Sequence, residues 1–457
     1  MTLRNRIQKL SPATLVLASF VLAILIGSGL LSLPFATTEE SIRWIDALFT
    51  ATSAVCVTGL IVVDTGTYFT PVGQGIILCL IQIGGIGVMT IAVVLFRWVG
   101  RKISFRQRMA MQDLFAQKPR EDILSIVKSI VIFTMVAELA GAVLLFIHWS
   151  DELPFKRALY TAVFHAVSAF CNAGFSTFPD SMMRYSDSLL LNFTMCGLIV
   201  TGGIGFPVLY DLQQWMRHHR KLHVKLSVQT KTVLVTTLLL IAIGAVMFSV
   251  LESNPPGSSL SAKQHILIPL FQSITCRTAG FNTVDIGALK EATLLLMIFL
   301  MYFGASPGSC GGGVKTTTLA LAVMFAINRV KRQRRVNLHH KSIPEETVSR
   351  SLSLMLLSGG IILAVLFMLL VGDGVSEQSP PAFRQGLFLA YLFETVSAFG
   401  TVGLSTGITG ELSAWGKAWI ILMMLVGRVG VLSFSYIIAG AKPIKGMEYA
   451  EENIMIG

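Results

Sequence analysis

The chain has 457 residues, of which 53% are hydrophobic and 13% are charged, and its mean hydropathy is +0.70. Soluble domains carry about 25% charged residues, so a chain this apolar is predicted to have the lipid bilayer as its solvent. The net charge of +11 would suit a nucleic-acid-binding protein, but the basic residues gather in alternate hydrophilic gaps, near 97–120, 217–231 and 329–350, which argues against that class. The positive-inside rule places these gaps and both termini in the cytoplasm.

Eight apolar stretches are long enough to cross about 30 Å of hydrocarbon, which takes roughly 20 helical residues. They cover approximately residues 14–35, 73–98, 124–148, 188–214, 228–251, 291–326, 350–372 and 414–440. A shorter, semi-polar stretch follows each odd-numbered one, at 41–53, 154–168, 262–273 and 382–397. A helix of about 12 residues rises only about 18 Å, so each short stretch is predicted to be a half-helix that enters and leaves the membrane on the same side.

The order of span, half-helix, glycine-bearing turn and span therefore occurs four times, and such internal repetition decides the architecture. The repeats are expected over residues 1–98, 99–222, 223–328 and 329–442, with a C-terminal tail over 443–457. Four equivalent units around one axis would bring the four half-helices and the four turns together at the centre.

The turns end in Gly59, Gly174, Gly280 and Gly403, each with a small polar residue five or six positions before it and a large apolar residue directly after it. Irregular backbone at membrane depth is tolerated only where it is buried in protein or lines a watery cavity. Rings of backbone carbonyls can replace the hydration shell of a potassium ion, and glycine permits the dihedral angles that aim them inward. Helix packing explains any single glycine, but four matching contexts favour a selectivity filter.

The predicted site is thus a monovalent cation held by the backbone carbonyls of the four turns, aided by the partial negative charge at the half-helix C-termini. The walls of the filter are expected to be residues 55–59, 170–174, 276–280 and 399–403. The candidate residues are Val55, Cys56, Val57, Thr58, Gly59, Cys171, Asn172, Ala173, Gly174, Arg277, Thr278, Ala279, Gly280, Gly400, Thr401, Val402 and Gly403. The Gly-Gly-Ile-Gly runs at 84–87 and 202–205 are interpreted as close packing against the half-helices.

The sixth apolar stretch is interrupted at residues 304–313, where five of ten residues are glycine and one is Pro307. Glycine costs about 1 kcal/mol and proline about 3 kcal/mol in a helix interior, so this segment is predicted to be a flexible gating loop inside the membrane. An ordinary kinked helix is the alternative. The candidate gating residues are Gly304, Ser306, Gly308, Cys310, Gly311, Gly312, Gly313, Lys315 and Arg428.

Arg428 lies inside the last apolar stretch, where a charge is costly and is by default a functional hypothesis. Its expected partner is either a carbonyl of the loop or a carboxylate, and a structural cation at the end of a broken helix is the alternative role. Arg277 is expected to brace the filter from outside the ion path. Glu138, His165 and Glu394 are expected to hydrogen-bond half-helices to their neighbours, with proton or sodium coupling as the alternative role. The six cysteines are expected to be buried and reduced. No catalytic or metal-binding motif has supporting context, so an enzyme is not expected.

Four turn sequences resemble those of the Trk/Ktr/HKT superfamily of potassium transporters. They are Thr-Gly-Leu at 58–60, Asn-Ala-Gly-Phe at 172–175, Arg-Thr-Ala-Gly-Phe-Asn-Thr at 277–283 and Thr-Val-Gly-Leu-Ser-Thr at 401–406. The resemblance covers essentially the whole chain, and the count of eight spans is most similar to the bacterial Ktr membrane subunits. It implies an all-α membrane protein of four M1-P-M2 repeats, with eight transmembrane spans and four re-entrant pore helices around one pseudo-fourfold pore.

The resemblance further implies potassium uptake across the bacterial plasma (inner) membrane through a gated, channel-like pore. It implies a homodimer and a cytoplasmic RCK-type (KtrA-like) ring of nucleotide-binding regulatory subunits, with the nucleotide bound only by that partner. Glycine rather than serine at position 59 favours potassium over sodium in this superfamily, and sodium is left open as an activator. A secondary transporter of another solute, which also uses broken helices, is the alternative, although repeats of one orientation favour a pore.

Overall fold

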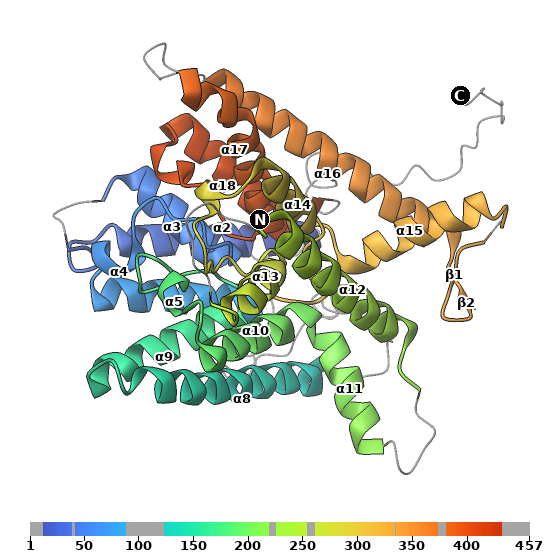
Figure 1. Cartoon of the computed structure of the whole chain (residues 1–457), viewed down its shortest axis with the longest axis horizontal. Coiled ribbons are helices and arrows are strands. Elements are labelled where there is room, and N and C mark those ends of the chain that lie inside the picture. The colour runs from blue at the N-terminus through green and yellow to red at the C-terminus, as the bar shows by residue number, and fades with distance from the viewer. Residues whose placement is uncertain are drawn as a thin grey trace, which may run out of the picture.

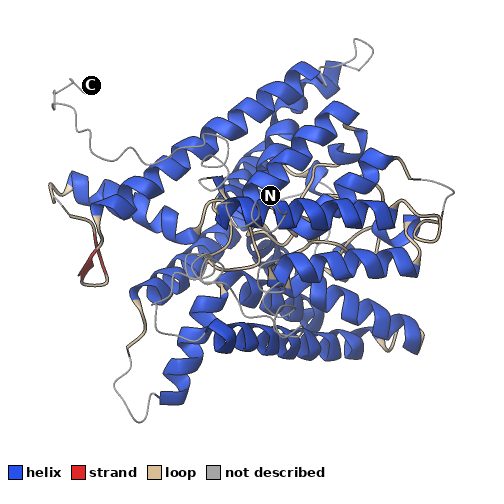
Figure 2. Ribbon diagram, turned by 180° about the vertical axis from the view of Figure 1, so that it is seen from behind, coloured by secondary structure: helices blue, strands red, loops and turns tan. Residues whose placement is uncertain are grey.

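The computed structural model describes residues 12–38, 42–87, 123–218, 225–253, 261–333, 335–372 and 381–431. The N-terminal basic residues, the basic gap near 97–120 and the tail over 443–457 lie outside these ranges. Within them the chain is helical, apart from loops and one short antiparallel hairpin of β1 (Asn337–Leu338) and β2 (Lys341–Ser342), in which Asn337 pairs with Ser342. The hairpin projects from the edge of the helical body (Figures 1 and 2).

The helices form four groups along the chain. The first group holds α2 (Pro12–Leu31), α3 (Trp44–Cys56), α4 (Thr65–Tyr68) and α5 (Pro71–Ile86). The second holds α8 (Ile123–Trp149), α9 (Phe155–Phe170), η1 (Met183–Tyr185), α10 (Leu189–Ile204) and α11 (Phe206–His218). The third holds α12 (Val228–Leu251), α13 (Gln264–Thr275), η2 (Ile286–Ala288), α14 (Glu291–Tyr302) and α15 (Thr316–Val330). The fourth holds α16 (Glu345–Gly372), α17 (Pro381–Gly400), η3 (Ile408–Glu411) and α18 (Ala414–Val429). In Figure 1 the second group (green) and the fourth (orange to red) lie on opposite sides of the molecule.

Length and composition of the described helices identify three that could cross a membrane alone, Lys128–Trp149, Val228–Leu251 and Glu345–Gly372. A fourth span is possible if the bent pair α10 and α11 is counted as one. The helices α8, α12 and α16 expose large apolar side chains, among them Leu139, Leu238 and Leu363, as helices facing lipid do. The expected count of eight spans is therefore not established by helix length within the described residues.

The stretch 188–214 was expected to be one span, and it is not one continuous helix. It is two helices, α10 and α11, which meet at 98°. The break falls at Gly205, whose φ of +97° lies in a region that side chains disfavour, and Pro207 follows within the first turn of α11. Gly87 and Gly430 have φ of +90° and +94° at the matching places after α5 and α18. Gly87, Gly205 and Gly430, each the last glycine of its glycine-containing run, thus end a helix rather than packing against one.

Helices α3, α9, α13 and α17 occupy the four stretches predicted to be half-helices, although α17, with 20 residues, is longer than expected. The C-terminal end of α3 is buried at every residue from 50 to 56. A hydroxyl starts the helix after the turn in three groups, because Thr70, Ser188 and Ser413 each accept a backbone N–H of the first turn of α5, α10 and α18. The turns are thereby held between a buried helix end and a capped helix start.

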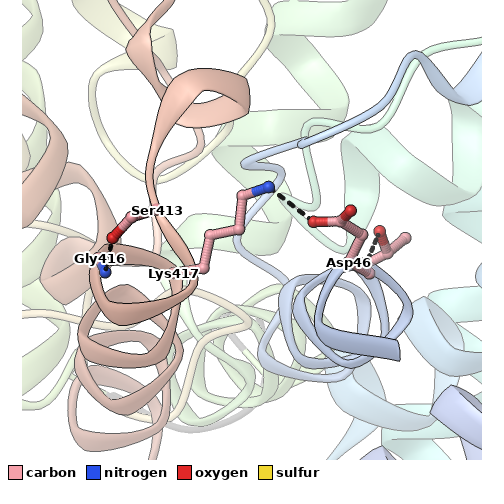
Figure 3. Close-up of polar contacts among 5 residues, drawn as sticks. Asp46, Ser413, Gly416 and Lys417 are labelled. Carbon is pink, nitrogen blue, oxygen red and sulfur yellow. Dashed lines mark hydrogen bonds and ion pairs between the residues drawn. The ribbon is translucent and has the colours of Figure 1, made fainter. Parts of the chain in front are cut away.

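A buried ion pair joins the first group to the fourth. The Nζ atom of Lys417 on α18 lies 2.7 Å from Oδ1 of Asp46 on α3, and the two side chains are only 8% and 11% exposed. Figure 3 shows Lys417 reaching across to Asp46, beside the cap that Ser413 makes to Gly416. The other two ion pairs of the described residues are more accessible: Arg350–Glu346 is exposed, and Arg184–Asp180 joins an exposed arginine to a half-buried aspartate.

Candidate ion pathway

The four turn glycines meet in a closed ring. A β-carbon built on Gly59 would lie 2.9 Å from the Cα of Gly174, and one on Gly174 would lie 3.0 Å from the Cα of Gly280. One on Gly280 would lie 3.3 Å from the Cα of Gly403, and one on Gly403 would lie 2.9 Å from the Cα of Gly59. The glycines therefore follow one another around the ring in chain order, with no space for a side chain between them.

The backbone of each turn repeats one unusual conformation. The ring glycines have φ of +94°, +71°, +79° and +93°. The residue two positions earlier is also left-handed in every turn, with φ of +57° at Val57, +60° at Asn172, +75° at Thr278 and +49° at Thr401. Successive carbonyls of an extended chain point in opposite directions, and a left-handed residue at every second position turns them toward one side. Such strain at four matching non-glycine residues makes these turns the candidate functional segments.

A hydroxyl from the preceding half-helix holds each turn in place. Ser53 and Ser397 accept the N–H of Gly59 and Gly403 at 3.0 and 3.1 Å. Ser168 and Thr275 donate to the carbonyl oxygens of Phe175 and Phe281 at 2.8 and 2.6 Å. These four residues are the small polar positions noted five or six places before each glycine, so that feature of the sequence corresponds to a backbone brace.

One face of the ring opens into a cavity of about 470 Å³. All four ring glycines line it, together with residues that follow them in the chain, including Ser176, Asn282 and Ser405, and one carboxylate, Asp64. The cavity is large enough for a hydrated cation, and its oxygen-bearing lining suits one.

The predicted gating loop lies against the residues that precede the ring glycines. Residues 303–315 form no helix between α14 and α15. The Gly312 N–H donates to Oγ1 of Thr401 at 2.8 Å, and a β-carbon on Gly311 would lie 2.1 Å from Oγ1 of Thr278. The Ser306 N–H donates to the carbonyl of Gly203 at 3.0 Å. The cavity touches the ring glycines and the residues after them, so the loop and the cavity lie on opposite ends of the turns.

Two cations hold the loop through its carbonyl oxygens. The Arg428 guanidinium donates to the carbonyl of Cys310 in the loop and to that of Gly84 on α5. The Lys315 ammonium donates to the carbonyls of Gly311 and Gly312, at 2.8 and 3.3 Å. Of the two partners considered for Arg428, a loop carbonyl or a carboxylate, the structure thus gives a loop carbonyl, that of Cys310, together with a carbonyl of α5.

The remaining membrane ionisable groups each bond to a nearby element. Arg277 points away from the ring, and its Nη2 donates to Thr237 on α12 at 3.2 Å. His165 bonds the Thr161 carbonyl and Ser176, and Glu394 accepts from Thr409.

The side chain of Glu138 accepts from Gln82 on α5 at 3.0 Å, a partner that the sequence did not single out. Five of the six cysteines are buried, as expected. Cys79 is exposed on α5, so the expectation that all six are buried is wrong there.

The family model described as TrkH, cation transport protein, matches residues 11–444. The chain belongs to this family. The Ktr system potassium uptake protein B of Vibrio alginolyticus is 40% identical, with 97% of this chain and 94% of that protein covered. The protein of the same name from Bacillus subtilis is 37% identical (98% and 97%), and the potassium/sodium uptake protein NtpJ of Enterococcus hirae is 35% identical (100% and 99%).

Membership of the TrkH family agrees with the resemblance of the four turn sequences to the Trk/Ktr/HKT superfamily. In fold, the chain is similar to the crystal structure of the potassium transporter TrkH from Vibrio parahaemolyticus, with a TM-score of 0.72 over 93% of this chain and 84% of that one. At 19% identity, that likeness shows the fold alone. The helical membrane fold is therefore that of a TrkH-family cation transport protein.

Proposed function

We propose that this protein takes up potassium across the plasma membrane through one gated pore. The observation that carries the proposal is the closed ring of Gly59, Gly174, Gly280 and Gly403, with its repeated left-handed backbone. The names of the relatives, potassium uptake and potassium/sodium uptake proteins, support the choice of ion.

In the proposed filter, a potassium ion sheds water in the cavity of about 470 Å³ and binds the carbonyls of residues 55–59, 170–174, 276–280 and 399–403. The hydroxyl braces hold those carbonyls at a fixed spacing, and a fixed spacing discriminates against an ion of another size. The end of each half-helix adds partial negative charge below the ring.

In the proposed gate, residues 304–313 block the path beneath the ring. The loop is held closed by Arg428 and Lys315, whose hydrogen bonds to its carbonyls must break or move before an ion can pass. Both cations also repel a potassium ion that approaches them. The loop lacks regular structure and is rich in glycine, so its displacement costs little backbone order.

The proposed assembly is a homodimer whose protomers each contain four M1-P-M2 repeats and eight spans, with both termini in the cytoplasm. A cytoplasmic RCK-type ring would bind the nucleotide, and the arm that carries β1 and β2 is the candidate docking surface. The name "Ktr system" of the relatives supports a partner of this kind. Sodium as an activator is consistent with the potassium/sodium name of NtpJ.

The test is ion flux into liposomes that contain the purified full-length protein. Potassium influx that exceeds sodium influx, and that changes when an RCK-type partner is added, is the expected result. Folded protein that passes neither cation, or that accumulates an organic solute against its gradient, would overturn the proposal and favour a secondary transporter.

A further inference from the structure

Two cysteines from different helix groups meet beside the ring. Cys171 belongs to the turn of the second group, Cys310 belongs to the loop of the third group, and both are 0% exposed. The Cys310 thiol donates to the carbonyl of Gly85 at 3.4 Å, and a β-carbon on Gly85 would lie 2.4 Å from Sγ of Cys171. The two thiols therefore pack against the same glycine of α5, and the Cys171 thiol also donates to Oε1 of Gln82 at 3.3 Å.

The two cysteines differ in how firmly they are held. Cys171 caps α9, with its N–H bonded to the Val167 carbonyl at 2.9 Å, so it moves only with the half-helix. Cys310 is held at the loop by its N–H bond of 3.3 Å to the Gly202 carbonyl and by Arg428. A covalent bond between the two sulfurs would therefore tie a movable segment to a fixed one.

We propose that Cys171 and Cys310 form a redox-sensitive pair, whose oxidation to a disulfide locks the loop against the ring and stops ion flux. This inference rests on the proposed function for its effect on flux, but not for its chemistry. Each thiol loses one proton and one electron, and a sulfur–sulfur bond forms. A peroxide is the oxidant: hydrogen peroxide accepts both electrons and both protons, its O–O bond breaks, and two water molecules leave.

The pair would be a stress response rather than a permanent bond. Cells keep protein thiols reduced in ordinary conditions, so the pair is expected to stay open and the pathway available. A rise in peroxide would close it, and a dithiol reductant would reopen it by thiol–disulfide exchange. Hydrogen peroxide is a small polar molecule, and any route that brings water to the loop also admits it.

The experiment uses the full-length protein in liposomes, treated with hydrogen peroxide, and reads two quantities in parallel. Mass spectrometry of alkylated peptides is expected to find a peptide in which residues 171 and 310 are linked. Potassium flux is expected to fall about tenfold, as a shift of most molecules to a locked state requires, and to recover with a dithiol reductant. In the Cys310→Ser variant neither the link nor the peroxide effect on its remaining flux is expected, whereas Cys79→Ser should behave as the wild type.

Peroxide that oxidises the exposed Cys79 but leaves no linked peptide would overturn the pairing. A linked peptide with unchanged flux would overturn the lock. The linked peptide is measured without any flux, so wild-type protein that forms it but carries no potassium at all would refute the proposed function while supporting the sulfur pair.

Discussion

Position 59 shows how little space the ring leaves. A β-carbon there would lie 2.5 Å from the carbonyl oxygen of Ala173, and the residue has φ of +94°. The substitution Gly59→Ser must therefore move the neighbouring turn and widen the spacing of its carbonyls. We expect potassium-over-sodium selectivity to fall by about tenfold, which corresponds to about 1.4 kcal/mol. The measurement is the ratio of potassium to sodium influx into liposomes.

Gly75→Ser is the matched control for this substitution, because it adds the same group to α5, where a β-carbon meets nothing within 4 Å. Its selectivity should equal that of the wild type. If Gly59→Ser also retained the wild-type ratio, the ring would not be the selectivity filter.

Arg428 is the second position at which one side chain is expected to control flux. Replacing it by glutamine removes charged hydrogen bonds to the loop and to α5, each of which contributes about 1.5–3 kcal/mol. Arg428→Gln should therefore raise flux without the regulatory partner by about tenfold or more. Arg350→Gln, at an exposed position on α16, should leave it unchanged. A lower melting temperature without higher flux would instead assign Arg428 a purely structural role.

In three groups, the helix that follows the turn (α5, α10 or α18) carries a glycine that lets it pack closely against the end of the half-helix. A β-carbon on Gly84, Gly202 or Gly427 would lie 2.0, 1.8 or 1.9 Å from the carbonyl oxygen of Val55, Phe170 or Phe399. This close packing is what the sequence predicted for the first glycine of the run. It also explains why the half-helix ends cannot shift along their neighbours.

Gly202→Ala is expected to destabilise the protein by about 1–3 kcal/mol, the usual cost of overpacking. Gly197→Ala on the same helix is the control, because a β-carbon there meets nothing within 4 Å. The melting temperature in detergent is the measurement. Equal melting temperatures for the two variants would show that α10 can move away from α9 at no cost.

The loop is the element on which the proposed gate depends. Deletion of residues 306–311 removes the Cys310 carbonyl that Arg428 holds and the N–H that bonds Gly203. We expect basal potassium flux without the partner to rise by about tenfold or more, because the closed state loses its ties. Flux that stays low in a variant with wild-type melting behaviour would show that another segment closes the path.

The helices of this chain were predictable wherever the length of an apolar or semi-polar stretch is enough to locate them. The expected half-helices differ from α3, α9, α13 and α17 by one to three residues at each end. The break between α10 and α11 was missed, because the apolar run continues across Gly205 and only the backbone angle there reveals the bend. Cys79 was missed for a related reason, since an apolar helix can face lipid or protein.

The ring glycines and the filter residues before them could be named from the repeated spacing, but the left-handed backbone of those residues could not be predicted. Val57, Asn172, Thr278 and Thr401 are of three residue types and none is glycine, yet they share a left-handed backbone, because four turns that meet at one axis impose it. Likewise, the choice between a carbonyl and a carboxylate for Arg428 depends on which segments fold together. Contacts across groups are a property of the whole arrangement, not of any local pattern.

At the scale of the molecule, the four groups form a ring, and one of the four contacts between neighbouring groups has no chain connection. Peptide segments connect the first group to the second, the second to the third and the third to the fourth. The fourth and first groups meet only through space, where Gly403 approaches Gly59 and Lys417 meets Asp46. The two charged residues lie 371 positions apart in the sequence, so no local pattern could have paired them.

Because the pair is buried, loss of one partner leaves the other as an uncompensated charge, which costs about 3–5 kcal/mol. We expect Lys417→Met and Asp46→Asn each to lower the melting temperature in detergent, and the double variant to be more stable than either single one. Glu346→Gln breaks an exposed pair and should cost at most about 1 kcal/mol. The contact between the fourth and first groups also sets the distance between the first and fourth turns. The single variants should therefore lose selectivity for potassium as well as stability, and a wild-type ion ratio in a destabilised Lys417→Met protein would show that the ion pair stabilises the ring without shaping it.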